Sequence, residues 1–346
     1  MEIETAKLRE CFEVLKNQPS PAPQLKIVLS EDKMNLYRWG GGNDFLHVSF
    51  PIEGGEEKEI IVYSKTFEQI VDLCQDEKMQ MNVSDNLHLE TSMFSYNIKG
   101  LEKEIFTDKT IKTSNLPSVK IENTSPLLNV STARDKTNRV SSMMGVLLEL
   151  SDGKLKVGAT DQYRIFTYEG DVESKSEAKA VVPYEFLHFA GRVKQEKVVY
   201  FSDNSVILEA DNILYESGTI AGDFPNIYKL ISEHETVFET VIQQEEASWA
   251  LRRLETVDAT VFTLEVEKGG NVLTMRANGN YGKAEETIKC SPATQSRVQN
   301  FNIEYFLNGI SPASADVYLQ FGEEENSPLM IAYDNYKYYL AAVRNA

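Results

Sequence analysis

The chain contains three copies of one local pattern, and this repeat restricts its fold more than any other feature. A short apolar strand runs into a short helix at Val62–Ile70, again at Val182–Ala190 and again at Phe301–Gly309. The copies are offset by 120 and then by 119 residues. Because stacked small repeats have periods of only ~20–50 residues, we infer that a whole domain is present three times.

Hairpin patterns accompany each copy. Val198–Phe201 and Val206–Ala210 flank Ser202-Asp203-Asn204, and Asn and Asp favour tight turns because they tolerate left-handed backbone. The matching pairs are Met79–Val83 with Leu87–Glu90 and Val317–Phe321 with Leu329–Tyr333. A second hairpin is predicted upstream in each copy, at Lys26–Leu29 with Met34–Tyr37, Val146–Leu150 with Leu155–Gly158, and Val261–Val266 with Val272–Met275.

Each copy also begins with a helical candidate. Thr5–Lys16 and Glu245–Val257 carry one-sided apolar stripes, whereas Leu127–Lys136 is weaker because it contains β-branched residues and serine. The order helix, hairpin, helix, hairpin predicts an α+β fold with helices on one face of antiparallel sheets. The length of 346 residues fits three domains, which we predict at 1–118, 119–235 and 236–346.

Composition predicts a soluble, cytoplasmic chain that does not enter a membrane. There is no run of 18 apolar residues, and the acidic N-terminus does not resemble a signal peptide. Cys11, Cys74 and Cys290 are isolated and odd in number, which is typical of reduced thiols.

Charge gives two opposing indications about nucleic acid. The net charge is −18, whereas most nucleic-acid-binding proteins have a basic footprint. Basic residues nevertheless recur on or beside the helical candidates, where the alternatives are a solvated helix face and a DNA-contacting surface. These residues are Lys7, Arg9, Lys16, Arg134, Lys136, Arg139, Arg192, Lys194, Lys197, Arg252 and Arg253.

No catalytic constellation is evident. The four histidines have no metal-ligand spacing with each other or with the cysteines, and Gly40-Gly41-Gly42 lacks the residues of a phosphate-binding loop. Asp161 beside Arg164 is compatible with either a catalytic carboxylate or a structural ion pair. We therefore predict no enzymatic activity, no cofactor and no metal site.

Several segments resemble the bacterial sliding clamp, the beta subunit of DNA polymerase III. Ala159–Ile165 reads Ala-Thr-Asp-Gln-Tyr-Arg-Ile, which is similar to that family's Ala-Thr-Asp-Gly-His-Arg-Leu. Gly222–Asn226 resembles its Gly-Arg-Phe-Pro-Asp, and Val181-Val182-Pro183 and Phe301–Leu307 match two further landmarks in the same order. The resemblance covers the whole chain and is weakest over the first 120 residues.

This resemblance implies a DNA sliding clamp. Two three-domain copies would pair head to tail as a homodimer and close a ring around double-stranded DNA, with helices lining the central hole and sheets outside. Such a ring holds DNA without reading its sequence and tethers a DNA polymerase, so it acts as a processivity factor in replication. A clamp loader would place it on DNA.

The family also implies a cleft between domains 2 and 3 that accepts partner peptides. By matching motifs, its residues here are Met143, Thr160, Gln162, Tyr163, Arg164, Ile165, Pro225, Lys229, Leu230, Asn302, Tyr305, Val343 and Arg344. Gln162-Tyr163 replaces the family's Gly-His, and Ala341–Ala346 replaces its Met-Pro-Met-Arg-Leu ending. Tyr184-Glu185 stands where the family often has basic residues. These departures suggest a divergent or phage-encoded member with partner peptides of its own.

Two other functions remain open from the sequence. One is a monomeric, triplicated protein-binding module that never encircles DNA, which the net charge of −18 favours. The other is an enzyme that uses Asp161 and Arg164. Oligomeric state separates the clamp from the monomeric module, because three domains cannot close a six-domain ring alone.

Overall fold

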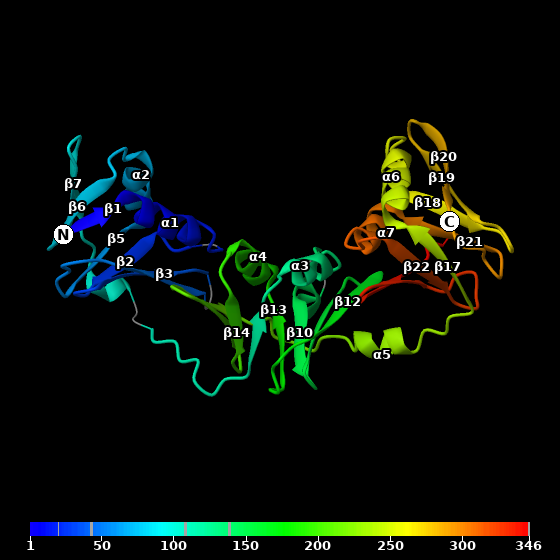
Figure 1. Cartoon of the computed structure of the whole chain (residues 1–346), viewed down its shortest axis with the longest axis horizontal. Coiled ribbons are helices and arrows are strands. Elements are labelled where there is room, and N and C mark those ends of the chain that lie inside the picture. The colour runs from blue at the N-terminus through cyan, green and yellow to red at the C-terminus, as the bar shows by residue number, and fades with distance from the viewer. Residues whose placement is uncertain (20, 42–43, 107–108, 138–139, 345–346) are drawn as a thin grey trace. The chain divides into compact units, whose positions relative to one another are not determined.

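The structure is a computed structural model that describes residues 1–19, 21–41, 44–106, 109–137 and 140–344. The chain forms two compact units, each assembled from two separate stretches of sequence (Figure 1). Unit 1 comprises Met1–Thr124 and Ser176–Thr219, and unit 2 comprises Ser125–Lys175 and Ile220–Ala346. The middle third of the chain therefore contributes to both units.

Unit 1 is built on antiparallel sheets. Its strands in the described residues are β1 (Glu2–Glu4), β2 (Gln24–Leu29), β3 (Lys33–Trp39), β4 (Phe45–Pro51), β5 (Lys58–Tyr63), β6 (Lys78–Val83), β7 (Asn86–Glu90), β8 (Ser95–Lys99), β9 (Ser118–Ile121), β13 (Ala178–Val182), β14 (Lys197–Phe201), β15 (Ser205–Ala210) and β16 (Ile213–Gly218). A short sheet has the order β1-β6-β7-β8, and a long sheet has the order β5-β2-β3-β4-β16-β15-β14-β9. The long sheet is continuous because Tyr215 of β16 pairs with Leu46 of β4, which joins strands from the first and second repeats.

The α-helices in the described part of unit 1 are α1 (Thr5–Lys16), α2 (Ser64–Leu73) and α4 (Tyr184–Arg192). A 3₁₀ turn, η1, spans Lys103–Ile105. Helices α1 and α2 lie side by side (Figure 1). The rings of Phe12 and Phe67 pack edge to face at 5.0 Å. Both rings are fully buried, and their burial stabilises the pair.

Unit 2 has the same kind of architecture. Its strands are β10 (Val146–Ser151), β11 (Lys154–Thr160), β12 (Arg164–Asp171), β17 (Phe238–Gln243), β18 (Val261–Val266), β19 (Val272–Gly279), β20 (Gly282–Lys289), β21 (Arg297–Asn302), β22 (Asp316–Phe321), β23 (Leu329–Tyr333) and β24 (Tyr336–Leu340). Its helices are α3 (Ser125–Ser131), α5 (Ile227–Ser232), α6 (Gln244–Glu255) and α7 (Ile303–Ile310), with a 3₁₀ turn η2 (Ser141–Met144).

The strands of unit 2 also form a long and a short sheet. The strands that unit 2 contributes to the long sheet run in the order β10-β11-β12-β24-β23-β22-β17, and the short sheet has the order β20-β19-β18-β21. Phe166 of β12 pairs with Tyr338 of β24, so strands of the second and third repeats again share one sheet. Their rings pack edge to face at 4.8 Å and are fully buried.

The predicted α+β fold and the six predicted hairpins are confirmed. The hairpins are β2–β3, β6–β7, β10–β11, β14–β15, β18–β19 and β22–β23. The repeated strand–helix pattern corresponds to β5–α2, β13–α4 and β21–α7. Within the described residues, no helix combines the length and the apolar character needed to cross a bilayer.

The helix predicted at Leu127–Lys136 is wrong at its C-terminal end, because α3 stops at Ser131. The Ser131 hydroxyl donates to the Leu128 carbonyl at 2.6 Å, and the Thr132 hydroxyl donates to the Asn129 carbonyl at 2.7 Å. Side chains that bond nearby carbonyls compete with helical hydrogen bonds, so the helix does not continue toward Lys136.

Candidate functional site

Helix α1 carries two of the predicted DNA-contacting lysines, and both are paired with carboxylates. Lys7 Nζ lies 3.1 Å from Glu4 Oε1. Lys16 Nζ lies 2.9 Å from Glu13 Oε1 and 3.0 Å from both carboxylate oxygens of Asp72 on α2. Burial alone would lower the pKa of Lys16, but the hydrogen bonds and charges of Glu13 and Asp72 together raise it. Lys16 is therefore a fully charged group that already has two anionic partners.

Arg9 has a structural role in this arrangement. Its Nε donates to the Val71 carbonyl at 3.2 Å, and a second guanidinium nitrogen donates to the Cys74 carbonyl. Carbonyls in the last turn of a helix lack partners within the helix, and Arg9 supplies them for α2. Arg9 thus ties α1 to the end of α2.

The basic residues predicted near α4 lie in three different settings. Arg192 is the last residue of the helix and donates to Asn17 of unit 1. Lys194 lies beyond the helix, exposed, and lines a pocket of about 610 Å³ together with Lys7, Glu10 and Glu13. The prediction that Lys197 lies on a helix surface is wrong. Lys197 begins strand β14 and is only 4 % exposed, and burial lowers the pKa of its ammonium group. Its side chain is therefore part of the folded core and not of a helix surface.

Arg134 and Lys136, which were predicted near α3, are also not on a helix. Arg134 follows the helix and donates to the Ser131 carbonyl at 3.2 Å, and Lys136 is an exposed residue of the following loop. Arg139 lies outside the described residues.

Helix α6 presents an exposed face that carries two arginines. The Arg252 guanidinium lies 5.8 Å from the ring centre of Trp249, which is 56 % exposed. Arg253 donates two hydrogen bonds, of 2.8 and 2.7 Å, to the carboxylate of Glu286 on β20. This two-pronged geometry is the strong form of an arginine–carboxylate contact.

The predicted peptide-binding residues converge within unit 2 around the turn between β11 and β12. The hydroxyl of buried Thr160 donates to the Arg164 carbonyl at 2.8 Å and accepts from the Gln162 amide at 3.2 Å. Gln162 has a φ of +77°, a backbone conformation that favours glycine, which is the residue in the corresponding family motif. The turn presents the Tyr163 ring to solvent, 49 % exposed.

The buried Arg164 side chain holds this turn in place through its contacts with neighbouring groups. Its Nε lies 2.9 Å from Asp161 Oδ2, with the Arg164 and Asp161 side chains 2 % and 10 % exposed. It also donates to the Thr132 carbonyl at 2.8 Å, and its guanidinium lies 3.8 Å from the centre of the Tyr305 ring. The sequence left two interpretations of Asp161 and Arg164 open, a catalytic carboxylate and a structural ion pair. Because the two charges are buried and paired with each other, the geometry supports the structural ion pair.

Helix α5 covers the next part of the sheet. Ile227 and Ile231 of α5 form a buried cluster with Ile165 of β12 and Met330 of β23. Phe224, Tyr228 and Tyr339 pack against this cluster. Leu230, on the other side of α5, is 49 % exposed. This buried apolar cluster, with the exposed Leu230 beside it, is suited to contact with apolar side chains of another molecule.

The segment before α5 is fixed by polar contacts. The Asn226 side chain caps α5 by accepting from the Lys229 amide at 3.2 Å. Pro225 is half-buried, and Lys229 is exposed and lies 3.6 Å from Glu233. Ser142 donates to the Asp223 carbonyl at 2.9 Å, which brings the turn that contains buried Met143 to this segment.

The C-terminal segment runs along the same turn. The Ala341 amide donates to the Tyr163 carbonyl at 2.9 Å, and the Val343 amide donates to the Asn300 carbonyl at 2.8 Å. Asn302 caps α7 by accepting from the Tyr305 amide at 2.9 Å. Val343 and Arg344 are exposed. The structure thus groups all the predicted peptide-site residues within unit 2.

Three side chains of this surface were missed by the sequence analysis. Met330, Tyr339 and Tyr228 contribute to the apolar cluster under α5, but no motif marks them. Strand alternation gave a usable signal, since Tyr339 is paired with Ile165 in the register and lies on the same face of the sheet.

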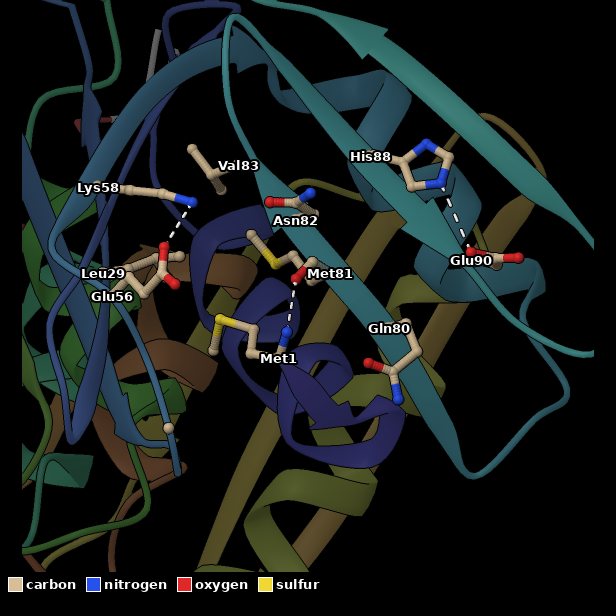
Figure 2. A pocket seen from close by; sticks show the side chains of 11 residues that line it. Met1, Leu29, Glu56, Lys58, Gln80, Met81, Asn82, Val83, His88 and Glu90 are labelled. Carbon is tan, nitrogen blue, oxygen red and sulfur yellow. Dashed lines mark hydrogen bonds and ion pairs between the residues drawn. The ribbon is translucent and has the colours of Figure 1, made fainter.

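Unit 1 contains a pocket of about 380 Å³ whose lining includes lysine, histidine and acidic side chains (Figure 2). Its polar groups already have partners: Lys58 lies 2.7 Å from Glu56, His88 lies 3.7 Å from Glu90, and the Met1 amine donates to the Met81 carbonyl at 3.1 Å. Across the described ranges, no three histidine, cysteine or acidic side chains are grouped as metal ligands. The pocket thus presents no nucleophile beside a general base.

Comparisons with known proteins show which folds this chain is similar to. Residues 115–226 match the family model described as the DNA polymerase III beta subunit, central domain, and these residues lie close to the predicted second domain. No curated protein sequence matches the chain.

The whole chain also has the fold of solved bacterial clamps. It is 18 % identical to the DNA polymerase III subunit beta of Pseudomonas aeruginosa, with a TM-score of 0.87 and 100 % of both chains covered. The Bacillus subtilis sliding clamp gives 17 % identity and a TM-score of 0.88, with 100 % of this chain and 99 % of that chain covered. The Helicobacter pylori beta clamp bound to a DNA ligase peptide gives 13 % identity and 0.88, with both chains fully covered. The resemblance inferred from the sequence motifs is therefore confirmed at the level of fold.

Proposed function

We propose that this chain, which has the fold of a bacterial sliding clamp from end to end, works as a DNA clamp: two copies encircle duplex DNA and tether a DNA polymerase to it. The observation that carries the proposal is the coverage, since this chain and whole clamp chains correspond along 99–100 % of their lengths. The match of residues 115–226 to the beta subunit's central domain supports the same function independently. A clamp acts by holding DNA and catalyses no reaction.

Ring closure requires a second copy, and the structure offers two edge strands for it. In the described residues, β8 ends the short sheet of unit 1 and β20 ends the short sheet of unit 2. Tyr96 on β8 is 48 % exposed, and Tyr281 beside β20 is 81 % exposed. Pairing β8 of one copy with β20 of the other would cover both open edges, which natural proteins rarely leave bare. Two such contacts related by a twofold axis would close the assembly.

DNA contact is assigned to the exposed cations on the helices. Five of these cations lie on helix surfaces of the two units: Lys7, Lys16, Arg192, Arg252 and Arg253. Arg9 instead bonds backbone carbonyls within the fold, and Lys197 is buried. Phosphate contacts of this kind hold a duplex without reading its bases, so a ring can slide along it. A polymerase tethered to such a ring faces template at a high effective concentration.

The partner site is assigned to the surface around Tyr163, Leu230 and Val343. One relative of the same fold, the Helicobacter pylori clamp, has been solved with a DNA ligase peptide. In this chain the exposed apolar groups above the α5 cluster would receive the apolar side chains of a polymerase or ligase peptide, and a clamp loader would compete for them. This function places the chain in the cytoplasm, with replicating DNA.

The alternative is a monomeric protein-binding module, which the net charge of −18 favours because it repels DNA at long range. Molar mass in solution separates the two functions. Light scattering across a concentration series should give twice the 39.1 kDa of one chain for the clamp. A mass of one chain that persists at the highest concentration would instead support the monomeric module.

The topological part of the proposal needs a second measurement. After loading onto a nicked circular plasmid, the protein should remain bound through gel filtration and should be lost when the plasmid is cut once. Retention that is equal on circular and linear DNA would contradict encirclement.

A further inference from the structure

Acidic side chains of this chain hold the helix cations that its proposed function directs toward DNA. Lys16 on α1 is surrounded by the carboxylates of Glu13 and Asp72, and Arg253 on α6 is paired with Glu286. The two places are in different units and involve different elements, one between two helices and one between a helix and a strand. A common arrangement in separate parts of the chain calls for a common explanation.

We infer that Asp72 and Glu286 compete with DNA phosphates for Lys16 and Arg253, so that the duplex gains these contacts only by displacing a carboxylate. This inference rests on the proposed clamp function and assigns a role to acidic residues that DNA contact alone would disfavour. The carboxylates keep the cations ordered and neutralised when no DNA is present.

The geometry at Lys16 permits such an exchange. The Lys16 side chain is 34 % exposed and that of Asp72 is 41 % exposed, so solvent and phosphates reach both groups. Exposed ion pairs are weak because water screens them, and a phosphate offers the ammonium an equivalent oxygen. Lys16 can therefore change partners without a change in the fold of α1 and α2.

The geometry at Arg253 is more directional. The Glu286 side chain is held on β20 and is only 20 % exposed, whereas the Arg253 side chain is 56 % exposed. Hydrogen bonds from Arg253 lower the pKa of the Glu286 carboxyl, so the carboxylate stays charged. A phosphate presents the same pair of oxygens that Arg253 now contacts on Glu286, and it is therefore a close chemical substitute.

The functional consequence is a clamp that holds DNA loosely. A cation that must leave a carboxylate gains less from a phosphate than an unpaired cation does. Binding to the duplex then depends less on salt than the number of basic residues predicts, because counterion release is partly replaced by partner exchange. Weak, exchangeable contacts are suited to a ring that must move along the duplex.

Asp72→Asn and Glu286→Gln test the inference. The dissociation constant for a short fluorescein-labelled duplex is measured by anisotropy over a series of salt concentrations. Each variant should bind severalfold tighter than the wild-type chain at low salt. The slope of log Kd against log salt should steepen by about 0.9 for Glu286→Gln, which releases Arg253, and by less for Asp72→Asn, because Glu13 still contacts Lys16 at 2.9 Å. Asp72 lies outside β8 and β20, so its effect is independent of the proposed edge contacts.

Glu10→Gln and Glu246→Gln are the matched controls. They remove the same charge from exposed positions of α1 and α6, and neither residue forms an ion pair with a helix cation in the described residues. In a Lys16→Gln background, Asp72→Asn should give no gain, because no cation remains to be released. A double-mutant cycle of this kind isolates the coupling between the two side chains.

The outcomes separate this inference from the function on which it rests. If the wild-type chain holds duplex DNA but the paired-site variants gain no more than the controls, the competition is disproved and the clamp function stands. A gain from Asp72→Asn that survives in the Lys16→Gln background would also overturn it. If the wild-type chain binds neither the short duplex nor the nicked circular plasmid, the clamp function itself fails.

Discussion

At the scale of single residues, Arg164 has the greatest consequence for the proposed partner site. It is buried, and four groups from different parts of the chain surround it: the Asp161 carboxylate, the Thr132 carbonyl, the Tyr338 hydroxyl and the Tyr305 ring. Buried charges are costly unless they are fully paired, so the turn that presents Tyr163 depends on this one side chain.

Arg164→Ala should therefore destabilise unit 2 strongly. The Asp161 carboxylate would stay buried without its partner, and the free energy of unfolding should fall by about 3–5 kcal/mol. Urea denaturation followed by circular dichroism measures it. Arg344→Ala is the control, since Arg344 is exposed and should change stability by less than about 0.5 kcal/mol. Equal effects of the two variants would contradict the anchoring role of Arg164.

His47 gives unit 1 a dependence on pH. Its ring stacks on Tyr37 at 4.4 Å, and burial, together with the charge of Lys33, lowers its pKa to about 4. The folded pKa is below the unfolded value of about 6.5, so the unfolded chain takes up the proton first as pH falls. Stability should fall by about 1.4 kcal/mol per pH unit between roughly pH 6.5 and 4 and should be unaffected by this group above that range.

The His47→Gln variant tests this assignment. Its urea midpoints, measured between pH 7 and pH 4, should fall less steeply than those of the wild-type chain. If the two chains lose stability in parallel, His47 is not the group responsible.

At the scale of elements, local pattern predicted most of the structure. Apolar alternation and turn residues located all six hairpins, and the apolar stripe gave α1 with its observed bounds of Thr5–Lys16. The end of α3 was missed because it depends on which carbonyl each hydroxyl bonds, which periodicity does not report. The joining of separate repeats in one sheet was also not predicted, since it depends on pairing between distant strands.

The candidate sites were predicted less completely than the elements. Motifs located the turn at Thr160–Ile165 and the segment at Pro225, because these short runs resemble a known family. They gave no information on side-chain direction, so buried Lys197 and Arg9, which bonds the end of α2, were grouped with exposed cations. Met330 and Tyr339 reach the apolar cluster through sheet register alone.

Helix α5 depends on close packing against β11. A Cβ on Gly158 would lie 2.3 Å from Ile227 Cδ1, and Ile227 is fully buried with little space to move. Gly158→Ala should lower the free energy of unfolding by about 1–3 kcal/mol and weaken binding of apolar partner peptides. Ile227→Val removes the clashing methyl group, so the double variant should recover much of the stability and peptide affinity of the wild-type chain. Absence of rescue would contradict this packing.

At the scale of the whole molecule, the proposed clamp function depends on association with a second copy. Tyr96→Asp places a charge on edge strand β8 and should convert the proposed dimer to monomer in light-scattering measurements. Tyr63→Asp is the matched control, because Tyr63 is similarly exposed, at 52 %, on β5, an edge strand of the long sheet. A dimer unaffected by Tyr96→Asp, or one lost equally in both variants, would contradict the β8 contact.

Because unit 1 is assembled from two separate stretches of the chain, its folding is delayed during synthesis on the ribosome. Strand β4 ends at Pro51, and its neighbour β16 begins at Ile213, so the long sheet stays open while the intervening residues are made. At about 5–20 residues per second, this delay lasts roughly 8–30 s. During that time β4 is a temporary unpaired edge on a nascent chain, exposed to chaperones and to neighbouring nascent copies. Because strands of the first and second repeats share one sheet, the first third of the protein cannot finish folding until the second third has been synthesised.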